Sequence, residues 1–79
     1  MVQRNIISVD AERRILLTTE RLTDGMWAVV ASIVESTPNG ERVVDLPIID
    51  ERFATPAEAE QSGEAQARGW IERNVARAA

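Results

Sequence analysis

The sequence predicts an α+β domain in which a three-stranded antiparallel meander carries one C-terminal helix on one of its faces. Two turn dipeptides, Asp24-Gly25 and Asn39-Gly40, separate runs of β-forming residues, as in consecutive hairpins. Farther on, Thr55-Pro56-Ala57-Glu58 is typical of a helix start. The 79 residues suffice for one domain. We expect an N-terminal segment over 1–12, the meander over 13–49 and the helix over 55–77.

The strands are predicted at about 13–23, 26–36 and 41–49. A competing interpretation makes 11–22 an amphipathic helix capped by Asp10, but the β-branched Thr18-Thr19 pair and the hairpin signal after it favour a strand. Pro47 has no N–H to give to a ladder, which places the third strand at an edge of the sheet.

Two-residue loops at both turn dipeptides set the predicted register. Leu16 then stands opposite Ile33 in the first hairpin, and Leu46 stands opposite Ile33 in the second. Because side chains alternate between the two faces of a strand, the apolar residues opposite one another share a face. That face is predicted to pack on the helix, and it contains Leu16, Leu22, Trp27, Val29, Ala31, Ile33, Val44, Leu46 and Ile48.

In the helix, Thr55 is the predicted N-cap and Glu58 completes a capping box. Ala59, Gly63 and Ala67 lie on one side and would let the helix approach the sheet closely. Trp70 and Ile71 would fill the wider end, and Trp70→Ala is expected to cost about 3–5 kcal/mol of stability. The predicted structural core is Leu16, Trp27, Val29, Ile33, Leu46, Trp70 and Ile71.

Residues 1–9 leave two alternatives open. Ile6, Ile7 and Val9 would form a fourth strand beside the first strand of the meander, or they would pair with a second copy of the protein.

Composition narrows the classes of function. The net charge is −4, and all nine cations are arginine. An acidic surface repels phosphate backbones, which disfavours nucleic acid as a partner. No segment has the length and apolar character of a signal peptide or a membrane span, so a cytoplasmic protein is expected.

Catalysis is not expected. Histidine, cysteine, lysine and tyrosine are absent, which removes the usual general base and the thiolate and amine nucleophiles. The carboxylate pair Asp50-Glu51 is interpreted as part of a solvated loop. We therefore expect neither an enzyme, nor a metal, nor a cofactor.

The sheet face away from the helix is predicted to be too apolar for solvent, since one helix covers one side. Its predicted interface residues are Ile15, Leu17, Val30, Val34, Val43 and Ile49. We expect a non-catalytic protein-interaction module that forms a homodimer through this face. The alternatives are cover by residues 1–9, an antitoxin-like or regulatory protein that binds a different protein, and a nucleic-acid-binding module.

The stretch from Trp27 to Asn74 resembles small uncharacterised bacterial domains of β-β-β-α order. The resemblance lies in Gly25-Met26-Trp27, Phe53-Ala54-Thr55-Pro56-Ala57-Glu58-Ala59 and Ala67-Arg68-Gly69-Trp70-Ile71-Glu72. It implies the fold and no function. The Thr55-x-x-Glu58-Ala59 start and Trp70-Ile71-Glu72 are also similar to HicB-type antitoxins, but the Pro-rich segment that follows the second strand in that family is missing here.

Overall fold

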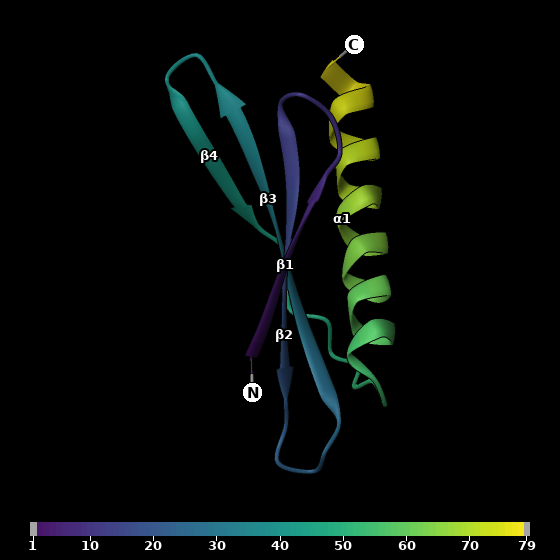
Figure 1. Cartoon of the computed structure of the whole chain (residues 1–79). Coiled ribbons are helices and arrows are strands. Elements are labelled where there is room, and N and C mark those ends of the chain that lie inside the picture. The colour runs from purple at the N-terminus through teal and green to yellow at the C-terminus, as the bar shows by residue number, and fades with distance from the viewer. Residues whose placement is uncertain (1, 79) are drawn as a thin grey trace.

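A four-stranded antiparallel sheet and one helix make up the fold, which confirms the predicted α+β class (Figure 1). The computed structural model describes residues 2–78, with side chains described for residues 2–74. The sheet has the order β1-β2-β3-β4 and is followed by α1. The elements are β1 (Val2–Ser8), β2 (Arg13–Arg21), β3 (Trp27–Thr37), β4 (Gly40–Asp45) and α1 (Pro56–Ala78).

The N-terminal segment forms a strand within the same chain. All seven residues of β1 pair with β2, from Val2 opposite Glu20 to Ser8 opposite Arg14. The turn between them is held by Asp10, whose Oδ1 accepts hydrogen bonds from the N–H groups of Glu12 and Arg13. Of the two alternatives for residues 1–9, the structure shows the fourth strand beside the first strand of the meander. These residues widen the sheet by one strand and do not fold over its second face.

The first hairpin has a three-residue loop in place of the predicted two-residue loop. The N–H of Leu22 donates to the carbonyl of Met26 at 2.7 Å, so Thr23, Asp24 and Gly25 form the loop. Gly25 has a φ of +86°, as the last residue of such loops commonly has. The extra residue shifts the register by one and turns every side chain of β2 to the other face. Ile33 therefore stands opposite Ile15 and not opposite Leu16.

The second hairpin differs from the prediction by two residues. Thr37 pairs with Gly40, so the loop is Pro38-Asn39. Because a shift of two preserves the face of each side chain, Val44 and Leu46 keep their predicted side. Leu46 continues the ladder through its N–H to the carbonyl of Ala31 at 3.0 Å, and β4 is an edge strand, as Pro47 predicted.

The helix packs closely on the middle of the sheet. Thr55 caps it as predicted, since its Oγ1 accepts a hydrogen bond from the N–H of Glu58 at 3.2 Å. Ala59, Gly63 and Ala67 are buried, and a Cβ added to Gly63 would lie 2.9 Å from both Leu17 Cδ2 and Val29 Cγ2. Glycine at this position is what allows α1 to lie so near to β2 and β3.

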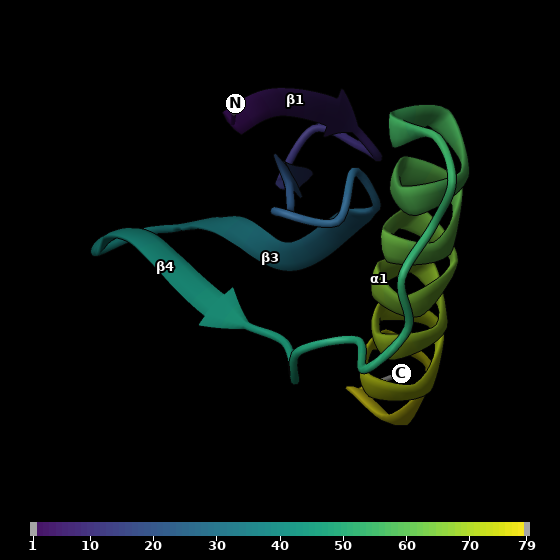
Figure 2. The same ribbon diagram turned by 90° about the horizontal axis from the view of Figure 1, so that it is seen from below.

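One hydrophobic core lies between α1 and the sheet. Its buried apolar residues are Ile15, Leu17, Trp27, Val29, Ala31, Ile33, Leu46, Ala59 and Ala67. Trp70 and Ile71 pack against this core and are half-buried. Figure 2 shows that α1 covers one side of the sheet and that no other element of the described chain covers the opposite side.

Candidate functional site: the open face of the sheet

The face of the sheet that points away from α1 is the main surface left uncovered by the fold, and we call it the open face. The register assigns its side chains to alternate positions on all four strands. From β1 to β4 these are Val2, Arg4, Ile6, Ser8, Arg14, Leu16, Thr18, Glu20, Ala28, Val30, Ser32, Val34, Ser36, Glu41, Val43 and Asp45.

Apolar side chains cross the open face in a staggered band, with Ser32 opposite Leu16 and Arg14 opposite Val34. Ile6 stands opposite Leu16, and Val34 stands opposite Val43. Leu16 and Val34 are diagonal neighbours on β2 and β3, close enough for long side chains to meet. Ile6 is 61% exposed and Val43 is 59% exposed. We call these four residues, together with Val30 beside them, the apolar band.

Charged and polar side chains surround the apolar band. Arg14 of β2 reaches across β3 and forms an ion pair with Glu41 of β4. Ser32 is buried, and its hydroxyl donates to Oδ1 of Asp45 at 2.8 Å. Arg4 lies opposite Thr18, and Glu20 lies beyond Thr18 toward the other end of the face. The rim thus carries both signs of charge, with two arginines and three carboxylates.

The predicted interface is corrected at three positions. Ile15 and Leu17 are 0% and 1% exposed and belong to the core, because the three-residue loop turns them toward α1. Ile49 is half-buried and packs against the core from the segment after β4. Val30, Val34 and Val43 do lie on the open face.

The predicted core needs one matching correction. Leu16 lies half-buried on the open face, since its side chain turned outward when those of Ile15 and Leu17 turned inward. Trp27, Val29, Ile33 and Leu46 are buried in the core as predicted.

Sequence reasoning missed Ile6 and the partners of Arg14. Once β1 is placed beside β2, alternation from the half-buried Ile7, which packs against the core, would have assigned Ile6 to the open face. The predicted two-residue loop would put Arg14 opposite Glu35, but Arg13 takes that place, with Nε donating to Glu35 Oε2 at 3.2 Å on the helix side. A three-residue reading of the first loop would have placed Arg13, and not Arg14, opposite Glu35.

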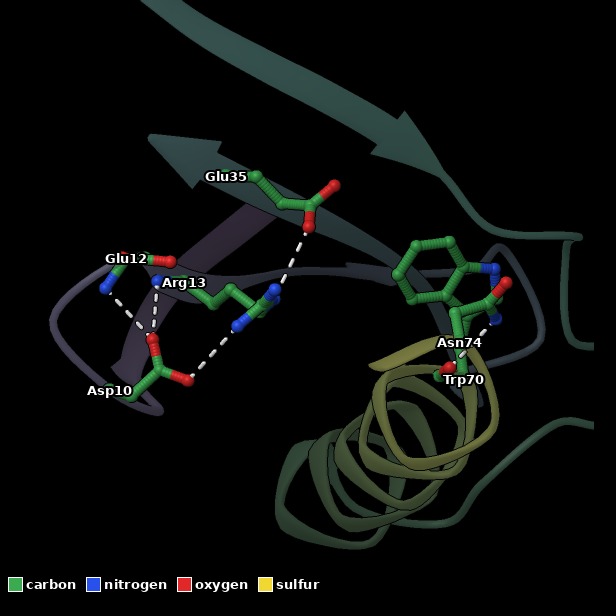
Figure 3. A network of polar contacts seen from close by, with 6 residues as sticks. All are labelled: Asp10, Glu12, Arg13, Glu35, Trp70 and Asn74. Atoms are coloured by element: carbon green, nitrogen blue, oxygen red, sulfur yellow. Dashed lines mark hydrogen bonds and ion pairs between the residues drawn. The ribbon is translucent and has the colours of Figure 1, made fainter. Parts of the chain in front are cut away.

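The helix side holds a small charged network near the end of α1 (Figure 3). Arg13 joins Glu35 to Asp10, with a 3.4 Å contact from its Nη1 to Asp10 Oδ2. The hydrogen bond from the Glu12 N–H is the main cause that lowers the pKa of the Asp10 carboxyl, and Arg13 lowers it further. These contacts hold the β1–β2 turn and join it to β3.

The described residues contain no group of three His, Cys, Asp or Glu side chains placed to hold a metal ion. Asp50 and Glu51 are both exposed.

Comparison of the chain with protein-family models, with curated proteins and with solved structures finds no match. Across the described residues, no helix combines the length and the apolar character that crossing a bilayer requires.

Proposed function

We propose that this protein is a non-catalytic interaction module that self-associates through the open face. The observation that supports the proposal is the apolar band, which crosses all four strands with Ile6 and Val43 largely exposed. An antiparallel sheet with one solvated face normally carries polar residues there. Contiguous apolar surface of this kind marks an interaction site.

The size of the face suits a dimer of ordinary dimensions. Four strands about 4.8 Å apart, with ladders of about 25 Å, give a flat area on the order of 500 Å². Side-chain relief increases the accessible area, which is then of the same order as the roughly 800 Å² per partner of a standard interface.

The arrangement of side chains favours a second copy as the occupant. Leu16 lies level with Ser32, and the residues two positions away on β3 are both valines, Val30 and Val34. A two-fold axis across the strands at that level would place Leu16 on the partner's Leu16 and exchange Val30 with Val34. The two Asp45 carboxylates would meet only at the exposed edge, where solvent screens them.

A nucleic acid is the poorer occupant. Its phosphates would meet the carboxylates of Glu20, Glu41 and Asp45 on the same face as the two arginines.

The test is the mass of the assembly in solution after a charge is placed in the apolar band. Val43→Arg changes a side chain that is 59% exposed, so the fold does not depend on it. Light scattering with gel filtration should show that Val43→Arg halves the mass of the wild-type assembly. Ile48→Arg is the matched control, since Ile48 is 77% exposed and lies off the open face. Equal masses for wild type and Val43→Arg would refute the proposal.

A further inference from the structure

The outer edge of β1 is a second surface that the fold leaves without a partner. Within residues 2–78, which the structure describes, β1 pairs with β2 alone, and its seven residues match β2 one to one, without a bulge. An edge strand presents a row of backbone N–H and C=O groups that another strand can use.

The hydrogen bonds around β2 show which backbone groups of β1 point outward. The Val9 N–H donates to the Arg13 carbonyl at 3.1 Å, and on the other side of β2 the Leu22 N–H donates to Met26. The backbone N–H and C=O groups of odd-numbered β2 residues thus point toward β1, and those of even-numbered residues point toward β3. By the same alternation, the N–H and C=O of Val2, Arg4, Ile6 and Ser8 point away from the sheet.

The two edges of the sheet differ in how they discourage pairing. β4 has charged residues at Glu41, Arg42 and Asp45 among its six residues, and Pro47 follows soon after. Charges and proline are the usual protection of an edge. β1 has one charged residue, Arg4, and contains no proline. The β1 edge is therefore the one left open to another strand.

We propose that β1 pairs antiparallel with β1 of a second copy, which joins the two sheets edge to edge. The register with full overlap of Val2–Ser8 centres on Asn5. It places Arg4 opposite the partner's Ile6 and Val2 opposite the partner's Ser8, so no like charges stand directly opposite. All four outward-pointing residues then take part in the shared ladder.

A second copy fits this edge better than a head-to-tail chain of strands. Two-fold pairing uses up both open edges at once and closes, whereas β1 against β4 of the next copy would continue without limit. The charges on β4 also oppose the second arrangement. The edge contact is independent of the open-face contact, because Val43 lies on β4, at the opposite edge of the sheet.

A disulfide test reads the register directly, because the chain has no cysteine. At the centre of the proposed pairing, two copies of Asn5→Cys would have Cα atoms about 4.5 Å apart, within the range of about 4.4–6.8 Å that a disulfide spans. We expect Asn5→Cys to give a covalent dimer under mild oxidation. Gln3→Cys is the control on the same strand and face, and it should stay uncrosslinked because the two copies stand about 14 Å apart. Failure of Asn5→Cys to crosslink, or equal crosslinking of Gln3→Cys, would overturn the proposed register.

A backbone test addresses the edge itself. Arg4→Pro removes an N–H that points outward, so the ladder to β2 keeps its hydrogen bonds. We expect Arg4→Pro to halve the mass of the assembly relative to Arg4→Ala, which removes the same side chain from the rim of the open face but keeps that N–H. Circular dichroism checks that both variants are folded. A folded Arg4→Pro variant with the same mass as Arg4→Ala would refute β1–β1 pairing. Val43→Arg tests the open-face contact in the same assay. A negative result for one contact therefore leaves the proposal for the other contact standing.

Discussion

Ile15 on β2 stands directly opposite Ile33 on β3, and both side chains are 0% exposed in the core beneath α1. Their pairing determines which face of β2 is buried beneath α1. Leu17 and Thr19 follow Ile15 on the same face and are also buried, while Leu16 and Thr18 lie on the open face and are half-buried. Several differences in stability follow from this division.

Adjacent leucines on β2 should differ sharply when truncated. Leu17→Ala removes buried methyl groups beneath α1 and should lower the free energy of unfolding by about 2–5 kcal/mol. Leu16→Ala, on the open face, should cost less than half as much in a monomeric background such as the Val43→Arg, Arg4→Pro double variant. Urea unfolding followed by tryptophan fluorescence measures both. A larger loss for Leu16→Ala would mean that the predicted two-residue loop had been right.

The two glycines of the described helix should respond in opposite directions to alanine. Gly63→Ala places a Cβ 2.9 Å from Leu17 and Val29, and this overpacking should cost about 1–3 kcal/mol. Gly69→Ala meets only the flexible end of Arg73 at 3.3 Å, so the better helix propensity of alanine should add about 0.5–1 kcal/mol. Thermal unfolding of the pair checks the close approach of α1. Stabilisation by Gly63→Ala would contradict it.

The first hairpin depends on a left-handed backbone at Gly25. Gly25→Ala adds a Cβ that meets nothing within 4 Å, so its cost comes from the φ of +86° alone. We expect a loss of about 1–2 kcal/mol. Gly25→Asn should recover part of it, since asparagine tolerates this conformation. If the two variants unfold at the same urea concentration, backbone strain is not the cause.

The Asp10 turn should give the protein a pH-dependent contribution to stability. Hydrogen bonds from Glu12 and Arg13 lower the pKa of Asp10 below its ordinary value of 3.8, so the folded state favours the ionised carboxylate. This contribution is complete above the unfolded-state pKa and is lost as the pH falls through the lower folded-state pKa. Wild type should therefore be more stable than Asp10→Asn at neutral pH, and the difference should vanish in strong acid. Urea titrations at several pH values measure it. A difference that stays constant with pH would rule out the carboxylate as its source.

The sequence was sufficient for the helix, for the meander and for the faces of β3 and β4, but it left the pairing of residues 1–9 undecided. The capping residues Thr55 and Glu58 and the turn glycines are local signals. The structure begins the helix where they predict it and forms both hairpins at these dipeptides, but the loops are 23–25 and 38–39 in place of 24–25 and 39–40. Val29 and Ile33 are buried as predicted because the strong apolar run of β3 makes it an interior strand in either register.

The sequence did not determine which side chains of β2 point toward the core. Ile15, Leu16 and Leu17 are consecutive apolar residues, so both phases of the strand offer an apolar face. The choice depended on one loop residue, Thr23, and Asp-Gly dipeptides occur in both two- and three-residue loops. The candidate site inherited this error, since Ile15 and Leu17 were assigned to the surface in place of Leu16. The alternation of β1 was likewise unavailable until its pairing with β2 was known.

The order of elements has a consequence for synthesis on the ribosome. Every strand is made before α1, and each pairs with its neighbour in the sequence, so the sheet has its hydrogen-bonding partners early. Its inner face must then wait for Ala59, Gly63 and Ala67 to emerge. During that interval both faces of the nascent sheet expose apolar side chains. A polypeptide released before α1 is complete would therefore be bound by chaperones and cleaved by proteases.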